Sequence, residues 1–426
     1  MSVTLVIGVQ WGDEGKGRIV DFLAASRPEI AARFGGGANA GHTVRVGDKT
    51  YKLRIVPSSV VAGARNCIIG PGAAVSPAQF VAELGALEGE GIDTSRVWLS
   101  DLAHLILPYH IELDRALEKR RGDSALGTTG NGIGPAYVDR VARKGVRAGD
   151  LRDPKALKVL IEARCSDAAE LGVNVDPHSV WEEAIALSPR VLPHVRDTVA
   201  MIGEALHAGK SILVEGAQGS MLDVNLGTYP YVTSSVTVAG GAGAGLGFGP
   251  TSVENVIGVA KAYATRVGAG PFPTELTDAV GEHLRTKGRE FGVVTGRPRR
   301  CGWLDLVALR YVAAVNGLTH LALTKLDVLD GMPEIAVCTE YANASEASLP
   351  FVIAAKPQPV LKMVRGWSEP TTAARAWDEL PSPARAYVEM IEEAVGVPVA
   401  YVSVGPERSQ IIVREHAPLR AVELKA

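Results

Sequence analysis

The stretch Val9-Gln10-Trp11-Gly12-Asp13-Glu14-Gly15-Lys16-Gly17-Arg18 decides the fold of this chain. It follows an apolar run, 3–7, that predicts a buried strand, and it precedes 19–25, which predict a helix. A strand, a glycine-rich turn and a helix form a cradle for phosphate, because backbone N–H groups and the positive end of the helix dipole converge there. The sequence therefore predicts a P-loop-like nucleotide-binding core.

The loop differs from an ordinary P-loop in its length and in its metal-binding residue. An ordinary P-loop has about four residues between its first glycine and Gly-Lys, followed by a hydroxyl residue for magnesium. Here six residues separate Gly8 from Gly15, and Gly17 stands in place of the hydroxyl. Asp13 is then the candidate ligand for a hard cation and the candidate base beside the phosphates, while Lys16 supplies a positive charge. The alternative is a structural glycine-rich turn with an ordinary surface lysine.

Composition narrows the class of protein. The chain has 426 residues, a net charge of −3, 46% hydrophobic and 21% charged residues, which is typical of a globular protein. Mild acidity and 5% aromatic residues argue against a nucleic-acid partner. No apolar run has membrane-spanning length and no signal peptide is visible, so we expect no membrane association. The four cysteines are far apart and favour reduced thiols in a cytoplasmic protein.

Several short apolar runs predict buried parallel strands, because such strands are continuously apolar rather than alternating. Helical segments between them indicate an α/β fold with a large, mostly parallel central sheet flanked by helices and with small excursions. We expect one domain over residues 1–426, since no low-complexity linker divides the chain. The runs lie at 67–69, 97–99, 212–214, 256–259 and 321–323.

One helix near the end of the chain is well marked. Ser382 is the predicted cap, Pro383 suits the first helical position, and Gly396 is the predicted stop. A strand is expected directly afterwards, at 399–404. The stretch 349–383 holds six prolines and little periodicity, which predicts an irregular surface excursion.

Three further glycine-rich clusters carry candidate functional groups. In 35–43, His42 is a candidate general acid near neutral pH, although a lone histidine is more often structural. In 127–135, two hydroxyls and several N–H groups suit an anion, and a tight structural loop is the favoured alternative. In 214–220, Gln218 follows a predicted strand, where α/β proteins place ligands, and its amide suits a base edge.

Two clusters near the end of the chain complete the set. Segment 294–300 holds three arginines in four residues, a composition that binds carboxylate or phosphate bidentately. Segment 324–327, Thr-Lys-Leu-Asp, is similar to the base-reading element of GTP-binding proteins, in which aspartate accepts from guanine N1 and N2. That pattern is short and is weak evidence alone.

Taken in order, the clusters resemble the adenylosuccinate synthetase family over nearly the whole chain, from Val6 to about Val413. The resemblance implies a GTP-dependent ligase that joins L-aspartate to IMP, giving adenylosuccinate, GDP and phosphate through a 6-phosphoryl-IMP intermediate. The motifs that carry it are Gln10-Trp11-Gly12-Asp13-Glu14-Gly15-Lys16-Gly17, Asn39-Ala40-Gly41-His42-Thr43, Gly268-Ala269-Gly270-Pro271-Phe272-Pro273-Thr274-Glu275-Leu276 and Thr324-Lys325-Leu326-Asp327-Val328-Leu329-Asp330-Gly331.

The resemblance also implies a role for individual residues. Asp13, Lys16 and His42 would be catalytic, and Asp13 with the carbonyl of Gly41 would bind Mg²⁺. The expected GTP-binding residues are Gly12, Glu14, Gly15, Gly17, Arg18, Gly41, Thr43, Arg299, Lys325, Asp327, Ser403 and Gly405. The expected IMP-binding residues are Asn39, Thr129, Arg143, Gln218, Thr233 and Arg297, and those for the amino acid are Val293, Val294, Thr295, Arg297 and Arg299. Arg143 would complete the site of a neighbouring subunit, so a homodimer is the expected working unit.

Several positions depart from the usual family pattern. Asn131 replaces an arginine on the amino-acid side of the site, and Val294 replaces a threonine. Asn225-Leu226 replace an Asp-His pair, Val236 replaces an asparagine, and Ala38 replaces a polar residue. Losing one charge-assisted contact to a carboxylate costs about 1.5–3 kcal/mol. One alternative to the synthetase is therefore a relative that uses a modified purine nucleotide or another amine donor. A separate alternative is an inactive nucleotide-binding regulator, which loss of Asp13 or His42 would favour, but both residues are present.

Overall fold

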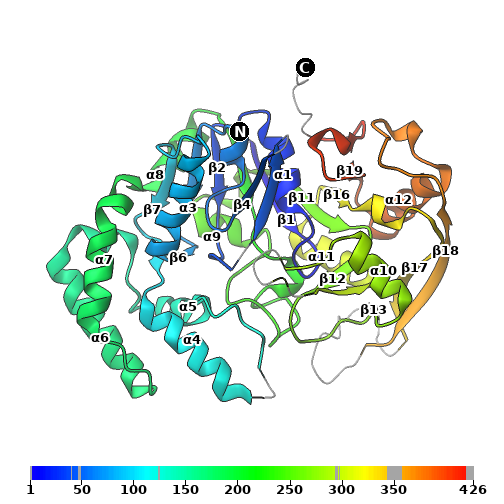
Figure 1. The fold of residues 1–426 in the computed structure, drawn as a ribbon. Helices are drawn as coiled ribbons and strands as arrows, with labels where there is room; N and C mark the ends of the chain where they lie inside the picture. The colour runs from blue at the N-terminus through cyan, green and yellow to red at the C-terminus, as the bar shows by residue number, and fades with distance from the viewer. Residues whose placement is uncertain are drawn as a thin grey trace.

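The computed structural model describes residues 2–39, 41–46, 49–122, 125–292, 296, 298–342 and 357–418. Within them a ten-stranded sheet has the order β20-β19-β16-β11-β1-β10-β2-β5-β7-β9 (Figure 1). Its neighbours are parallel except for the antiparallel pair β19 and β20. The predicted α/β fold with a mostly parallel sheet is thus confirmed. The strands are β1 (Ser2–Gly8), β2 (Ile30–Arg33), β5 (Asn66–Ile69), β7 (Val97–Ser100), β9 (Val195–Arg196), β10 (Ser211–Glu215), β11 (Val253–Lys261), β16 (His320–Thr324), β19 (Val399–Ser403) and β20 (Ile411–Val413).

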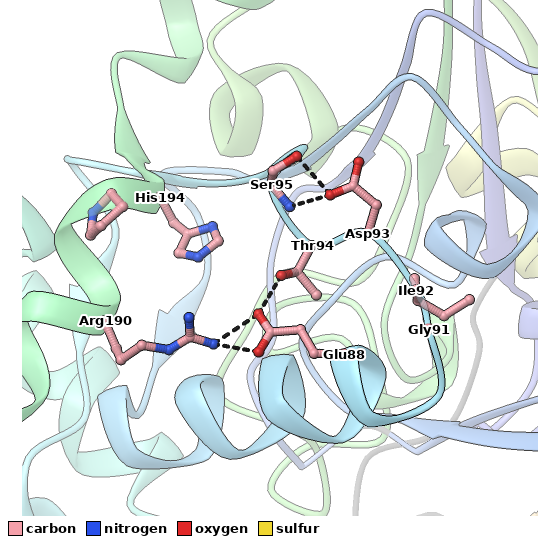
Figure 2. Close-up of a pocket in the computed structure, with 9 residues that line it drawn as sticks. Glu88, Gly91, Ile92, Asp93, Thr94, Ser95, Arg190 and His194 are labelled. Carbon is pink, nitrogen blue, oxygen red and sulfur yellow. Dashed lines mark hydrogen bonds and ion pairs between the residues drawn. The ribbon is translucent and has the colours of Figure 1, made fainter.

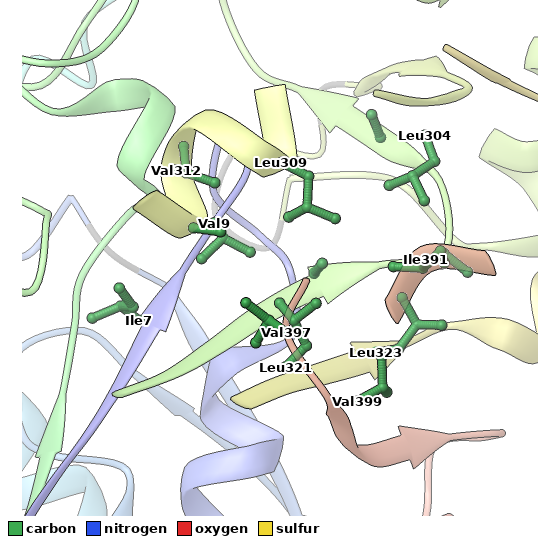
Figure 3. Packing of buried hydrophobic residues seen from close by; sticks show 14 of the residues in the cluster. Ile7, Val9, Leu304, Leu309, Val312, Leu321, Leu323, Ile391, Val397 and Val399 are labelled. Carbon is green, nitrogen blue, oxygen red and sulfur yellow. The ribbon is translucent and has the colours of Figure 1, made fainter. Parts of the chain in front are cut away.

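Strand β1 is buried from both sides because its side chains are mostly apolar on both faces. Leu5 and Ile7 belong to a core cluster that also holds Leu309 of α11 (Leu306–Asn316) and Ile391 of α12 (Ser382–Val395). Figure 3 shows these helices packed over the strands. Val6 faces the other way, into a cluster with α1 (Lys16–Ala24). Each fully buried aliphatic side chain stabilises the fold by about 1.5–3 kcal/mol, so the loop after β1 is built on a rigid base.

Helix α12 confirms the helix predicted near the end of the chain, with one correction. Pro381 occupies the N-cap position and Ser382 is the first helical residue, so the prediction of Ser382 as the cap was wrong. Gly396 ends the helix with φ 71°, as predicted, because glycine adopts the left-handed conformation without strain. The buried Tyr387 packs on the core, and β19 follows where a strand was expected.

The prediction of an irregular excursion over 349–383 was wrong for its central part. Residues Pro359–Trp367 form β18, which pairs antiparallel with β17 (Met332–Tyr341). Most of β18 is partly or fully exposed, so it lacks the apolar run that marks a buried strand. Pro359 is its first residue, a position where a missing N–H is tolerated. Residues 349–356 lie outside the described part of the chain.

The remaining elements complete the layers around the sheet (Figure 1). A second core cluster lies under α3, α4, α6 and α7, beside β5 and β7. The other helices are α2 (Ser59–Ala62), α3 (Pro77–Gly89), α4 (Pro108–Arg121), α5 (Ile133–Val141), α6 (Pro154–Glu170), α7 (Pro177–Val191), α8 (Thr198–His207), α9 (Gly241–Leu246) and α10 (Ala279–Lys287). The other strands are β3 (His42–Val46), β4 (Lys49–Leu53), β6 (Ala74–Val75), β8 (His104–Leu105), β12 (Ala264–Arg266), β13 (Glu275–Leu276), β14 (Arg300–Gly302) and β15 (Leu304–Asp305).

Candidate functional site

Most of the predicted functional loops leave the carboxyl ends of adjacent strands. The phosphate loop follows β1, the segment before His42 follows β2, and the Gln218 loop follows β10. On the other side of β1, the Lys325–Asp327 segment follows β16 and the Ser403–Gly405 segment follows β19. These strands lie next to one another in the order β19-β16-β11-β1-β10-β2. Because parallel strands end at the same edge of a sheet, ligands of open α/β sheets bind there.

The phosphate loop is built around one of its own carboxylates. The Glu14 side chain is fully buried, and its Oε1 accepts from the backbone N–H of Gln10 (3.1 Å) and Gly12 (2.8 Å). A Cβ at Gly8 or Gly219 would lie 2.4 Å from this carboxylate, so glycine is required at both positions. Asp13, in contrast, has a 35% exposed side chain. Asp13 is therefore the carboxylate of the loop that a ligand can reach.

Lys16 links the phosphate loop to the loop after β10. Its ammonium group is buried, pairs with Glu14 Oε2 at 2.6 Å, and donates to the carbonyl oxygen of Gln218. Gly15, with φ 93°, starts α1 directly before Lys16. The lysine charge thus lies at the positive end of the helix dipole, where an anion is attracted most strongly.

His42 is held by a buried carboxylate that the sequence did not single out. Its Nδ1 pairs with Glu215 Oε1 and lies 3.2 Å from Ser58 Oγ. Glu215 also accepts from the backbone N–H (2.7 Å) and hydroxyl (2.6 Å) of Ser58. Burial alone would raise the pKa of Glu215, but the charge and hydrogen bond of His42 and the charge of Arg33 hold it at about 2. With Nδ1 engaged, Nε2 is the nitrogen of His42 that can serve a substrate.

Asp13 and Arg299 form an ion pair, with Asp13 Oδ2 2.7 Å from Arg299 Nε. Arg299 Nη1 donates to Glu290 at 2.6 Å, and Glu290 accepts from Lys261 at 2.8 Å. Burial would raise the pKa of Glu290, but the neighbouring charge of Lys261 and those of Lys325 and Arg299 hold it at about 2. Glu290 and Lys261 were not predicted, since neither stands in a recognisable motif.

Three of the predicted IMP-binding residues meet in one chain of hydrogen bonds. Gln218 Nε2 donates to Asn39 Oδ1 at 3.1 Å, and Asn39 Nδ2 donates to Thr233 Oγ1 at 3.5 Å. Among the described residues, the buried Oε1 of Gln218 has no hydrogen-bond partner. Gln218 is also held at φ 52°, an uncommon conformation for this residue type. A buried, unsatisfied acceptor on a strained residue is typical of a ligand-binding position.

The residues predicted for guanine come together at the ends of β16 and β19. Burial lowers the pKa of Lys325, whose ammonium group donates to the carbonyl oxygen of Gly288 at 2.7 Å. Burial raises the pKa of Asp327. Arg18 Nη1 donates to Ser403 Oγ at 3.1 Å, and Ser403 donates to the carbonyl oxygen of Gly405 at 3.2 Å. Burial lowers the pKa of Arg18 to about 10, which leaves it charged at neutral pH.

Other predicted residues lie outside this cluster. Thr129 is exposed on the connection between α4 and α5, and Thr43 is exposed on β3 beside the half-buried Gly41. Arg143 follows α5 at φ 63°, is exposed, and has no side-chain partner in the described ranges. Val293, Val294, Thr295 and Arg297 lie outside the described residues, so the predicted amino-acid loop is represented here by Arg299 alone.

A cavity of about 650 Å³ is lined by residues that include Glu88 of α3 and Arg190 of α7 (Figure 2). Its lining includes Thr94 and Ser95, which precede β7, whereas the predicted loops follow their strands. Glu88 pairs with Arg190 at 2.7 Å and accepts from Thr94 at 2.6 Å. The charges of Glu88 and Arg190 are therefore already matched by each other. The cavity is therefore separate from the candidate site.

Two properties of the described ranges bear on membrane and metal binding. Among their helices, none combines the length and the apolar character needed to cross a membrane. Nor do these ranges contain a group of three or more His, Cys, Asp or Glu side chains placed to hold a metal ion.

Comparison with known proteins gives one consistent result. Residues 5–412 match the family model described as adenylosuccinate synthetase. The chain is 48% identical to the adenylosuccinate synthetase of Moorella thermoacetica, over 97% of this chain and 99% of that protein. It is 49% identical to that of Sorangium cellulosum, over 98% and 100%. Its structure is similar to that of fully ligated adenylosuccinate synthetase from Plasmodium falciparum, with a TM-score of 0.93, 36% identity, and coverage of 97% and 100%. A cyanophage S-2L succinoaminodeoxyadenylate synthetase, with a TM-score of 0.63 and 20% identity, shares the fold.

Proposed function

Because the chain belongs to the adenylosuccinate synthetase family, we propose that its candidate site makes adenylosuccinate in two steps through 6-phosphoryl-IMP. The enzyme is a GTP-dependent carbon–nitrogen ligase that joins L-aspartate to IMP in purine biosynthesis. The observation that carries the two-step proposal is the difference in burial between the two carboxylates of the phosphate loop. Glu14 is buried as part of the loop, while Asp13 stays accessible beside the phosphate cradle.

In the first step, Asp13 removes the N1 proton of IMP, and O6 attacks the γ-phosphorus of GTP with GDP as the leaving group. Lys16 and the N–H groups at the start of α1 stabilise the charge that develops on the phosphoryl oxygens. His42, oriented by Glu215, donates through Nε2 toward the phosphates. Glu14 contributes to GTP binding through the shape that it gives the loop.

In the second step, the amine of L-aspartate attacks C6, and phosphate leaves with the former O6. Phosphorylation turns a poor leaving oxygen into a good one, so the remaining task is to hold the amine in place. Arg299, with Arg297 and residues 293–295, would bind the carboxylates of L-aspartate. A guanidinium matches a carboxylate in geometry as well as in charge.

The donor set around Asp13 fits Mg²⁺. This ion is usually bound by one or two carboxylates together with substrate phosphates. Asp13 supplies an accessible carboxylate beside the phosphate cradle, and the carbonyl of Gly41 would be a second protein ligand. When bound, the ion would neutralise phosphate charge.

The order of the strands suggests how the two nucleotides lie. Guanine would lie at the ends of β16 and β19, surrounded by Lys325, Asp327, Ser403 and Gly405. The GTP phosphates and their surroundings would be lined by Gly12, Gly15, Gly17, Arg18, Gly41, Thr43 and Arg299. Asn39, Gln218 and Thr233 would hold IMP on the other side of β1, with Thr129 and Arg297. The reacting O6 and γ-phosphate would then meet at β1.

We further infer a cytoplasmic homodimer built from one domain per chain. The exposed Arg143, unpartnered in the described ranges, supports a role in a neighbouring subunit's IMP site. The sheet joins β1 to β20, which supports one domain over 1–426. The buried, unlinked cysteines Cys67, Cys165, Cys301 and Cys338 are consistent with a reducing compartment.

A substrate-matrix assay tests this function. Purine nucleotides, amine donors, and GTP or ATP are combined, and phosphate release is measured with nucleotide product. We expect turnover with IMP, L-aspartate and GTP, and little without any one of them. Faster turnover with another donor or nucleotide would favour the alternative raised by Asn131 and Val294, and no turnover with any combination would favour a regulator.

A further inference from the structure

Glu290 is a fully buried carboxylate to which the reaction scheme above gives no role. Its Oε1 accepts from Lys261 Nζ at 2.8 Å and from the hydroxyl of Tyr263 at 2.5 Å, while Oε2 accepts from Arg299 Nη1 at 2.6 Å. Lys261 is itself buried and is further fixed by Thr265 Oγ1 at 2.7 Å. A buried charge with this many partners is held in one position.

The backbone reinforces the link between Glu290 and Arg299. The N–H of Arg299 donates to the carbonyl oxygen of Glu290 at 2.9 Å, and Phe291 forms a β-bridge with Pro298. Lys261 ends β11, which pairs with β1 directly beneath the phosphate loop. Glu290 therefore connects Arg299 to the central sheet.

The guanidinium of Arg299 is held by two carboxylates, through a hydrogen bond from Nη1 to Glu290 and through the charge of Asp13, whose Oδ2 lies 2.7 Å from Nε. Nε itself forms no hydrogen bond in the described ranges. In the described part of the chain no partner is found for Nη2. A guanidinium that is fixed in this way presents its remaining N–H groups in one direction without the entropic cost of ordering a long side chain.

We propose that Glu290 is a positioning residue that fixes Arg299, so that the guanidinium presents Nη2 to a carboxylate of the amino-acid substrate. The proposal rests on the proposed function, because that function assigns Arg299 to the amino acid as well as to the surroundings of the GTP phosphates. Lys261 and Tyr263 are the anchors of Glu290, and Arg299 is the group that meets the substrate. Glu290 acts on binding of the amino acid and not on binding of IMP.

The substitution Glu290→Gln tests the proposal, with KM measured separately for L-aspartate and for IMP. Loss of a charge-assisted contact predicts a rise of about ten- to a hundredfold in KM for L-aspartate, with KM for IMP changed less than about twofold. Tyr263→Phe removes one neutral hydrogen bond and predicts a smaller rise, of about two- to tenfold. This milder variant keeps the test informative if Glu290→Gln fails to fold.

A matched control lies nearby. Glu275 pairs with Arg300, the residue after Arg299, at 2.7 and 2.5 Å, and within the described ranges it forms no hydrogen bond or ion pair with Arg299 or Glu290. We expect Glu275→Gln to leave both KM values within about twofold. An equal rise of both KM values in Glu290→Gln, or no rise for L-aspartate, would overturn the proposal.

A double-mutant cycle tests whether Glu290 acts through Arg299. In the background of Arg299→Lys, we expect Glu290→Gln to change KM for L-aspartate less than about twofold, because neighbours that act together are not additive. Full multiplication of the two effects would contradict the proposal. If the unmodified enzyme prefers another amine donor, the proposed substrate fails, and the same cycle with that donor still tests Glu290.

Discussion

At the scale of single residues, Asp13 and Glu14 show that two side chains with the same chemistry can have different roles because of where they lie. The two carboxylates are adjacent, yet Glu14 is enclosed by the loop's own N–H groups and Lys16. Asp13 has φ 59° and points to Arg299. The sequence predicted both as functional and could not separate them, because the burial of Glu14 depends on Gly8 and Gly219 lying against its carboxylate in the folded chain.

The first prediction concerns Asp13→Asn, which keeps the size of the side chain and removes its basicity. We expect IMP-dependent phosphate release to fall about 10²- to 10⁴-fold, the usual contribution of a general base. GTP binding should persist, as measured by fluorescence titration with a labelled nucleotide. Retention of more than a tenth of the activity would show that another group takes the N1 proton.

The second prediction concerns Glu215, whose pKa of about 2 in the folded state lies below its value near 4.3 in the unfolded chain. A carboxyl group whose pKa is lower in the folded chain contributes its full stability at pH values above its pKa in the unfolded chain. This contribution is lost as the pH falls toward the pKa of the folded chain. The contribution is on the order of 3 kcal/mol. Urea unfolding between pH 5 and about 2 should show a shallower loss of stability in Glu215→Gln than in the unmodified chain. Parallel curves for the two proteins would contradict this account.

At the scale of elements, the site is an outcome of strand order. Central strands were predictable because a strand buried on both faces is continuously apolar, as β1 and β16 show. The edge strand β18 was not predictable, since its exposed residues carry no such pattern. Strand order was not predictable either, because β10, which neighbours β1, lies some two hundred residues away in sequence.

The third prediction follows from placing Asp327 after β16, on the side assigned to guanine. Asp327→Asn removes the charge that accepts from guanine N1 and N2. We expect kcat/KM for GTP to fall about ten- to a hundredfold, with kcat/KM for ATP nearly unchanged. Asp378→Asn, at a 95% exposed side chain, serves as the surface control. An equal fall with both nucleotides would contradict base recognition by Asp327.

At the scale of the whole molecule, the sequence predicted the catalytic and binding residues better than the residues that hold them in place. Asp13, Lys16 and Gln218 stand in recognisable motifs and meet at one edge of the sheet. Glu215 and Glu290 hold functional residues in place. Glu215 is far in sequence from its partner His42, and the contact of Glu290 with Arg299 forms only in the folded chain. Such positioning residues depend on tertiary contacts, which a sequence pattern does not specify.

The fourth prediction concerns the assembly. If Arg143 completes the neighbouring site, Arg143→Ala and Asp13→Asn proteins are each nearly inactive, but mixing and re-equilibrating them restores activity. In an equal mixture half of the dimers are mixed, and each mixed dimer has one intact site of two, so about a quarter of the normal activity should return. Sedimentation confirms the dimer. Mixed dimers without recovered activity would contradict a shared site.

The central claim is that O6 of IMP receives the γ-phosphoryl group of GTP and leaves as an oxygen of phosphate, and an isotope experiment tests it most directly. IMP labelled with ¹⁸O at C6 is converted with L-aspartate and GTP, and the released phosphate is examined by mass spectrometry. The account predicts that the label appears in phosphate, one atom per turnover. Unlabelled phosphate, with the isotope released into water, would contradict it.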